Sequence, residues 1–191
     1  MNEIKTIISN SIGVKSKLLA DDHLIETIRQ IVAAMITAFQ ADKKVFFCGN
    51  GGSAADAQHL AAELSGRFYL DRRPLFAEAL HGNVSYLTAV ANDYSYDEVY
   101  ARLISANGRR EDILVAISTS GNSKNIIRAI EAANAAGLIT VGLTGETGGA
   151  MKTLCRYLIN VPSRDTPRIQ ESHILVGHII CELVEKHLFG K

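Results

Sequence analysis

The sequence predicts an α/β protein with a five-stranded parallel sheet flanked by helices. After residue 42, short apolar runs alternate with stretches of helical periodicity, which is typical of a parallel sheet with helices on both faces. The run at 113–117 is continuously apolar, as expected for a strand that is buried on both sides. The expected strands are residues 45–48, 76–80, 113–117, 140–143 and 157–161.

Helices are expected between and after these strands. Following the strand at 113–117, apolar residues such as Ile126, Ile130 and Ala133 recur with helical spacing. The last helix is apolar nearly all round, which is typical of a helix buried in a subunit interface. The expected helices are residues 53–65, 84–91, 96–106, 124–136, 149–154 and 167–188.

Two further helices are expected ahead of the first strand, over residues 4–39. Apolar residues recur there at helical intervals, and Asp21 and Asp22 divide the pattern, either one being a suitable cap for the second helix. Exposed apolar stripes of this length usually mark an interface. We therefore expect residues 1–40 to serve oligomer packing and residues 43–188 to form the α/β core of a single domain, 1–191.

The composition favours a globular protein of the cytoplasm. A chain of 191 residues suits one domain, and 47% hydrophobic with 21% charged residues is an ordinary balance for such a domain. A net charge of zero argues against nucleic acid or an anionic membrane as partner, and no signal peptide or transmembrane run is recognisable. Cys48, Cys155 and Cys181 are odd in number and lack metal-type spacing, which indicates reduced thiols.

A hydroxyl-rich segment, Ser-Thr-Ser-Gly-Asn-Ser at 118–123, follows the strand at 113–117 and opens the next helix. Backbone N–H groups and hydroxyls at the positive end of a helix favour an anion, and phosphate is the anion we expect. A plain helix cap by Asn122 or Ser123 is the alternative, but a cap needs one such residue, whereas five of these six positions carry one. The segment therefore predicts a phosphate site.

A glycine-rich loop at 49–53 follows the first strand. Its glycines let backbone approach a ligand closely, and Ser53 is a candidate cap for the next helix. The glycine spacing is not that of a dinucleotide-binding fingerprint. Asn92 and Asp93 end the helix at 84–91 at a loop, where such residues are ordinary helix-stop signals.

His59 and Glu63 lie four residues apart on the helix at 53–65 and therefore share a face. Such a pair is compatible with a plain surface ion pair. Its position one helix length from the glycine-rich loop favours a second interpretation, in which the pair holds a divalent metal or places a carboxylate as a general base.

The last helix carries Gln170, Glu171, His173 and His178 on an otherwise apolar surface. Each histidine alone would more often be a hydrogen-bonded core residue, but the grouping favours a site. Gln170 and His178 are about 12 Å apart along a straight helix. Their side chains meet at one point only if they lean together or if two copies of the chain contribute, which suggests a site at a subunit interface.

Taken together, these motifs resemble the phosphoheptose isomerases of the sugar isomerase (SIS) domain family. The resemblance runs in order through nearly the whole chain after the first helix. It rests on residues 48–53, 59–67, 91–94, 117–123 and 168–171 with His173 and His178. It implies a Rossmann-like SIS domain and a homotetramer with active sites between subunits. It further implies conversion of sedoheptulose 7-phosphate to D-glycero-D-manno-heptose 7-phosphate, the first step toward nucleotide-activated heptose for lipopolysaccharide or capsule.

The resemblance also implies a role for each matching residue. Substrate binding falls to Asn50, Gly51, Gly52, Glu63, Asn92, Asp93, Ser118, Thr119, Ser120, Ser123 and Gln170, of which the hydroxyl residues take the phosphate. One zinc ion per subunit falls to His59, Glu63, Gln170 and His178. For the reaction through an enediol, we expect Glu63 to take the carbon proton and His178 to serve the oxygen.

Two alternative functions and one sequence difference from the family bear on this interpretation. Related regulators bind a replication initiator protein without catalysis, but they lack the paired Glu and His that stand here at Glu63 and His178. Phosphosugar-sensing transcription regulators carry an added DNA-binding segment, for which this chain has neither length nor charge. Asn83 stands in a turn where family members usually have Asp, which leaves the preferred sugar open rather than the reaction class.

Overall fold

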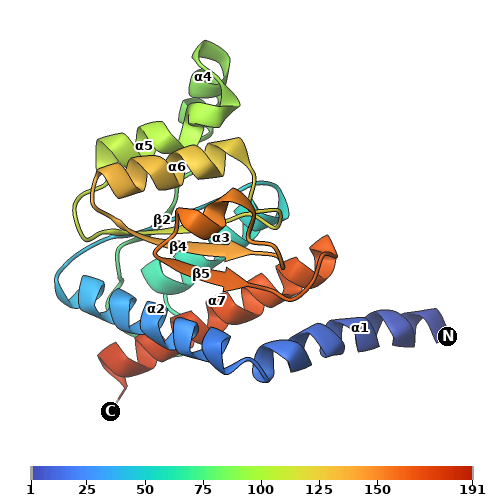
Figure 1. The fold of residues 1–191 in the computed structure, drawn as a ribbon. Helices are drawn as coiled ribbons and strands as arrows, with labels where there is room; N and C mark the ends of the chain where they lie inside the picture. Colours follow the sequence, from blue (N-terminus) through green and yellow to red (C-terminus); the bar gives the residue numbers. More distant parts are fainter. Residues whose placement is uncertain (1, 191) are drawn as a thin grey trace.

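The computed structural model describes residues 2–190, and within them a parallel five-stranded sheet lies between two layers of helices (Figure 1). The strand order is β2-β1-β3-β4-β5. The predicted fold class is therefore confirmed. The strands are β1 (Val45–Gly49), β2 (Ala77–Ala79), β3 (Ile113–Ile117), β4 (Ile139–Thr144) and β5 (Tyr157–Asn160).

Each face of the sheet has its own helical layer and its own apolar core. In β1, Val45 and Phe47 point into the core shared with α2 (Asp22–Gln40), α3 (Gly52–Ser65) and α7 (Thr166–Phe189). Phe46 and Cys48 point the other way, toward α5 and α6. The helices of this second layer are α4 (Val84–Asp93), α5 (Val99–Asn107) and α6 (Lys124–Ala135).

The first helix, α1 (Asn2–Leu19), extends away from the body of the domain (Figure 1). Its end is anchored to α7 through Glu171, which accepts a 2.6 Å hydrogen bond from the Ser11 hydroxyl and lies 3.4 Å from the Lys15 ammonium. Along this helix, the side chains of Ile4, Ile7, Ile8 and Ile12 are 53–64% exposed. These isoleucines form the apolar stripe that the sequence predicts to pack against another subunit.

One helix end agrees with the prediction and two differ from it. Asp21 is the cap of α2, since its side chain accepts a 3.0 Å hydrogen bond from the Leu24 N–H. Ser53 is not a cap: it is buried inside α3, and Gly51 holds the cap position without a side-chain bond. The helix predicted at 84–91 continues through Asn92 to Asp93, so these two residues are not in a loop.

Two predicted helices contain 3₁₀ turns. The stretch at 96–106 begins as a 3₁₀ turn, η1 (Tyr96–Glu98), and becomes α-helical only at Val99. Tertiary bonds explain the tight start, because the hydroxyls of Tyr96 and Tyr100 reach back to Asn50 and to the carbonyl of Gly49. The stretch at 149–154 is the 3₁₀ helix η2 (Gly149–Thr153).

After β1 the chain forms β2 at one edge of the sheet and then returns to form β3 on the other side of β1. The strand order therefore reverses between β1 and β3. In the β1–β3 pairing, Gly49 lies opposite Ile117, so both strands end at the same level. Ligands of open α/β sheets bind at such a reversal, beyond the carboxyl ends of the strands. The glycine-rich loop and the hydroxyl-rich loop therefore leave the sheet side by side.

None of the helices described for residues 2–190 is both long enough and apolar enough to cross a membrane. Within the same residues, Cys48, Cys155 and Cys181 are unpaired. Burial raises the pKa of each of these thiols, and the pKa reaches about 12 for Cys155 and Cys181. The three cysteines therefore stay as neutral thiols within the apolar packing.

His173 is a core residue rather than part of a surface site. It is fully buried, and its Nε2 donates a 3.1 Å hydrogen bond to the carbonyl of Thr144 at the end of β4. Its Nδ1 has no hydrogen-bond partner among residues 2–190. Burial lowers the pKa of His173 to about 4, against an opposing effect of the Thr144 bond, so the imidazole is neutral at pH 7.

This buried histidine predicts a loss of stability in mild acid. The folded-state pKa lies below the usual value of 6.5, so the unfolded chain binds the proton first as the pH falls. We expect the contribution of His173 to the free energy of unfolding to fall by roughly 3 kcal/mol between about pH 6.5 and pH 4. Urea unfolding across this range should show a shallower decline for His173→Gln, whose amide can still donate to Thr144. Equal declines in the two proteins would contradict the assignment.

Candidate active site

Helices α3 and α7 run side by side in the same direction on one face of the sheet. Gly52 lies against Gln170, and further along both helices Leu60 lies against Gly177. A Cβ added to Gly177 would come within 2.6 Å of both Leu60 methyl carbons. The absence of a side chain at Gly177 therefore allows this close approach of the helices.

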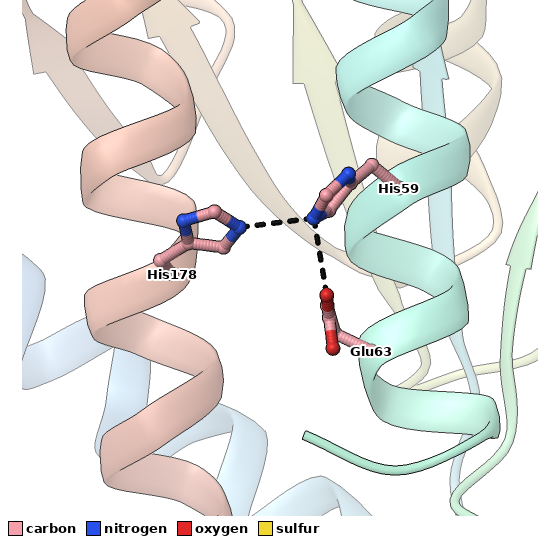
Figure 2. Close-up of side chains that lie close together, drawn as sticks. All are labelled: His59, Glu63 and His178. Atoms are coloured by element: carbon pink, nitrogen blue, oxygen red, sulfur yellow. Dashed lines mark hydrogen bonds and ion pairs between the residues drawn. The ribbon is translucent and has the colours of Figure 1, made fainter. Parts of the chain in front are cut away.

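His59 and Glu63 from α3 meet His178 from α7 across this contact (Figure 2). Nε2 of His59 lies 3.0 Å from Oε1 of Glu63 and 3.0 Å from Nε2 of His178. One nitrogen or oxygen atom from each of the three side chains lies within 4.8 Å of the others. A single protomer thus assembles these three predicted residues, which we call the His59–Glu63–His178 triad.

The triad has the donor set of a zinc site. Two imidazole nitrogens and one carboxylate oxygen are a common protein ligand set for catalytic Zn²⁺, which keeps a further position open. Both Nε2 atoms and the Glu63 carboxylate already converge on one point, so the residues fit the ion.

Gln170, the fourth ligand that the family resemblance implies, lies elsewhere in the protomer. Its amide packs against Gly52, with Nε2 only 2.6 Å from where a Cβ of residue 52 would be. Along α7, Gln170 is about 12 Å from His178. It therefore faces the glycine-rich loop and the start of α3.

Asp56 is an additional acidic residue beside the triad. Its Oδ2 atom is buried and has no hydrogen-bond partner among residues 2–190. Burial raises the pKa of Asp56, and the nearby His59 and His178 oppose the rise. Asp56 is not among the residues predicted from the sequence, although the spacing of 56, 59 and 63 could have placed it on the same helical face.

The glycine-rich loop is tied to the start of α6 by a pair of amides. Asn50 donates to Asn125 at 2.9 Å, and Asn125 donates back at 2.8 Å. The Tyr96 hydroxyl adds a 3.1 Å hydrogen bond to Asn50. Gly51 has a φ of +55°, a conformation that favours glycine. Asn125 and Tyr96 carry no sequence signal for this role, because the contact depends on strand pairing.

The hydroxyl-rich loop gathers its side chains at the N-terminus of α6. The Ser118 hydroxyl lies 3.0 Å from that of Ser123 and 3.5 Å from that of Ser120. Ser123 occupies the cap position but makes no side-chain cap bond, and the Asn122 amide bonds Ser120 and Ala150 instead. Neither residue caps the helix as the alternative interpretation requires, so the arrangement favours an anion site.

A cavity of about 300 Å³ borders this loop. It is lined by Thr119, Ser120 and Asn122 together with residues 146–147, 163–164, 166 and 169. A larger cavity of about 820 Å³ lies at the amino ends of the strands, between α2 and the first residues of β4 and β5. The larger cavity contains none of the predicted site residues, whereas the cavity beside the loop contains Thr119 and Ser120.

Asn92 and Asp93 lie at the end of α4, which stands away from the sheet (Figure 1). Both are exposed, and the Asn92 amide donates a 2.9 Å hydrogen bond to Asp93. In this protomer they contact neither the glycine-rich loop nor the triad through a described hydrogen bond. Asn83, where the family resemblance implies Asp, caps α4 by accepting a 3.0 Å hydrogen bond from the Tyr86 N–H, a role that Asp performs equally.

Residues 14–145 match the SIS domain family. Over 190 residues the chain is 53% identical to the phosphoheptose isomerase of Aneurinibacillus thermoaerophilus, and the matched region covers 99% of this chain and 96% of that protein. The chain belongs to the phosphoheptose isomerase family. Its fold agrees with solved structures of family members. The phosphoheptose isomerase GmhA of Neisseria gonorrhoeae has a TM-score of 0.91 at 40% identity, covering 97% of this chain and 98% of that chain. The Francisella tularensis phosphoheptose isomerase has a TM-score of 0.92 at 35% identity, covering 97% of both.

The serine cluster predicts a selective loss of phosphate affinity. If Ser123 binds the phosphate as predicted, removing its hydroxyl deletes one donor to the anion, and a hydrogen bond to a charged group contributes about 1.5 kcal/mol. For Ser123→Ala we expect the Kd for a sugar phosphate, measured by calorimetry, to rise roughly 10-fold. Ser105→Ala is the matched control, since that hydroxyl only bonds the Ala101 carbonyl on α5. An unchanged Kd in Ser123→Ala would exclude this hydroxyl as a phosphate ligand.

Proposed function

We propose that this protein interconverts sedoheptulose 7-phosphate and D-glycero-D-manno-heptose 7-phosphate through an enediol, as the first step toward nucleotide-activated heptose. The chain belongs to a family of phosphosugar isomerases, and it matches the isomerases named above over nearly the whole length of both chains. The observation that carries the proposal is the convergence of Glu63 and His178 within one protomer. The alternative, a regulator that binds a replication initiator, has no support from these relatives.

The spacing of the loops and the triad supports a long, phosphorylated sugar as substrate. The hydroxyl-rich loop would hold the phosphate, and Asn50, Gly51 and Gly52 would line the path of the sugar. His59 lies roughly two turns, or about 10 Å, beyond Gly52 along α3. In an open-chain heptose 7-phosphate, C1 and C2 are at the opposite end of the carbon chain from the ester. A phosphate at the loop therefore directs the reacting carbons toward the triad.

Glu63 and His178 supply the two proton transfers of the reaction. An aldose and its ketose differ by the transfer of one proton between C1 and C2, with a second transfer between their oxygens. Glu63, whose side chain is 22% exposed, would take the carbon proton and return it to the neighbouring carbon. His178 comes from a separate helix and would exchange the proton with the oxygen. Gripping the distant phosphate holds the carbons in place for both steps.

Zinc forms part of the same proposal, with His59, Glu63 and His178 as its ligands. Bound zinc would polarise the substrate carbonyl and stabilise the negative charge of the enediolate. Gln170, which packs against Gly52, would contact the sugar and could complete a metal site only through a different side-chain position or a second copy. Asn92 and Asp93, exposed on α4, would bind sugar in the same assembly.

The exposed surface supports a homotetramer with active sites at subunit interfaces. His59 is half exposed, and on α7 the residues Leu175, Ile179 and Leu183 form an apolar stripe beside His178 that is 36–41% exposed. A second copy that covered this stripe would shield the triad from water. The isoleucines of α1 offer a second apolar surface.

The unpaired cysteines agree with a cytoplasmic location for this single SIS domain.

The proposed base is tested by Glu63→Gln, which keeps the side-chain shape and removes the proton acceptor. Because a positioned base contributes 10²–10⁴-fold, we expect kcat to fall roughly 1,000-fold while sedoheptulose 7-phosphate still binds. Glu131→Gln, an exposed change on α6, is the matched control. Turnover near the wild-type rate in Glu63→Gln would show that another residue is the base.

The proposed metal site is tested by chelation and by elemental analysis. We expect one zinc per subunit in the purified protein and a loss of turnover after dialysis against a chelator, restored by added Zn²⁺. His59→Gln should weaken zinc binding by about 10- to 100-fold or more, because it removes a direct ligand. Full activity in protein shown to be free of metal would remove zinc from the mechanism.

A further inference from the structure

A buried ion pair joins the loop after α3 to α7. The side chains of Arg72 and Glu185 are only 3% and 2% exposed, and Arg72 Nε lies 3.0 Å from Glu185 Oε1. Glu185 also accepts hydrogen bonds from three successive backbone N–H groups, those of Phe68, Tyr69 and Leu70, at 2.7–3.0 Å. Burial tends to raise the pKa of Glu185, but these bonds and Arg72 outweigh it and leave the pKa below its usual range.

The other side of Arg72 holds the end of α3. Its Nη2 donates a 2.8 Å hydrogen bond to the carbonyl of Glu63, and its Nη1 donates to the carbonyls of Leu64 and Gly66 at 2.8 Å. The last carbonyls of a helix have no partner within the helix and need an outside donor. Arg72 satisfies this requirement at the residue that carries the proposed base.

The same loop reaches His178 through Phe68. The Phe68 ring stacks on the His178 ring, with centroids 5.6 Å apart and an interplanar angle of 27°. Since Glu185 binds the backbone N–H of Phe68, the ion pair sets the position of this ring. Glu185 itself lies roughly two turns beyond His178 on α7. The Arg72–Glu185 pair thus contacts the main chain of one catalytic residue and the support of the other.

We propose that Arg72 and Glu185 are positioning residues, which orient Glu63 and His178 for proton transfer through the end of α3 and through Phe68. This inference rests on the proposed function of Glu63 and His178. A buried ion pair is weak evidence for stability, because apolar replacements are often as stable. A fully hydrogen-bonded pair, by contrast, holds its neighbours in one geometry, and a displacement of 1 Å at a catalytic group can cost 10²-fold in rate.

Two variants perturb the arrangement by different routes. Arg72→Lys keeps the charge but loses the planar fork that bonds the α3 carbonyls and Glu185 together. Phe68→Leu removes the ring that supports His178 and leaves the ion pair intact. Arg29→Lys is the matched control, since Arg29 forms an exposed pair with Glu26 on α2. Each protein is assayed well below its thermal midpoint, so that unfolding does not enter the rates.

We expect both variants to lower kcat for sedoheptulose 7-phosphate by roughly 10- to 100-fold. KM should stay within about threefold, because the phosphate and sugar contacts are untouched. The ring proton resonances of His178 should shift in the NMR spectrum of Arg72→Lys, in which the Phe68 ring is still present, and zinc affinity, measured by chelator competition, should weaken in both variants. Arg29→Lys should match the wild type in every measurement.

Folded Arg72→Lys and Phe68→Leu proteins with wild-type kcat and zinc affinity, and with unmoved His178 resonances in Arg72→Lys, would overturn the proposal and leave the ion pair a purely structural element. If Arg72→Lys does not fold, Phe68→Leu gives the same decision alone. Failure of the proposed function has a different signature: the wild type would not isomerise sedoheptulose 7-phosphate. Shifted His178 resonances in Arg72→Lys and weaker zinc binding in both variants would then still support the positioning role.

Discussion

The contact between α3 and α7 is the constraint on which the site depends. Gly177 lets α7 lie directly against Leu60, and the two helices then run in the same direction along one face of the sheet. With the helices in this register, His59 and Glu63 on one helix reach His178 on the other. A Cβ at Gly177 would come within 2.6 Å of both Leu60 methyl carbons, so either the Leu60 side chain or the helices would have to shift. The packing of these two helices thus brings three polar side chains together.

The sheet supplies the other half of the geometry. Because β1 and β3 are neighbours that end at the same level, the glycine-rich loop and the hydroxyl-rich loop lie together, and the Asn50–Asn125 amide pair joins them. Helix α3 starts at the first of these loops and carries His59 about 10 Å further on. One helix therefore links the proposed phosphate end to the proposed reacting end. Arg72 and Glu185 hold the far end of that helix against α7.

Much of the fold and part of the site could be predicted from residue patterns. Continuous apolar runs identified the strands, and the confirmed fold class followed from their alternation with helices. The loops at 49–53 and 118–123 were recognisable because glycines and clustered hydroxyls have few other uses at strand ends. The helices predicted at 96–106 and 149–154 are present, but their 3₁₀ turns at Tyr96–Glu98 and Gly149–Thr153 were not predicted. Bonds from Tyr96 and Tyr100 reach the β1 loop there, and Gly148 and Gly149 have positive φ. Periodicity does not report such contacts.

The sequence by itself determined which chemical groups the chain carries, the order of its strands and helices, and the family to which its motifs point. Only the tertiary structure decided that His59, Glu63 and His178 share one point in a single protomer, that Gln170 packs against Gly52, and that one carboxylate oxygen of Asp56 is buried near the two histidines. The same holds for the Arg72–Glu185 pair, whose members are 113 residues apart. The physical reason is that spacing along a helix gives the face of a residue, whereas the opposing residue depends on how closely two backbones pack.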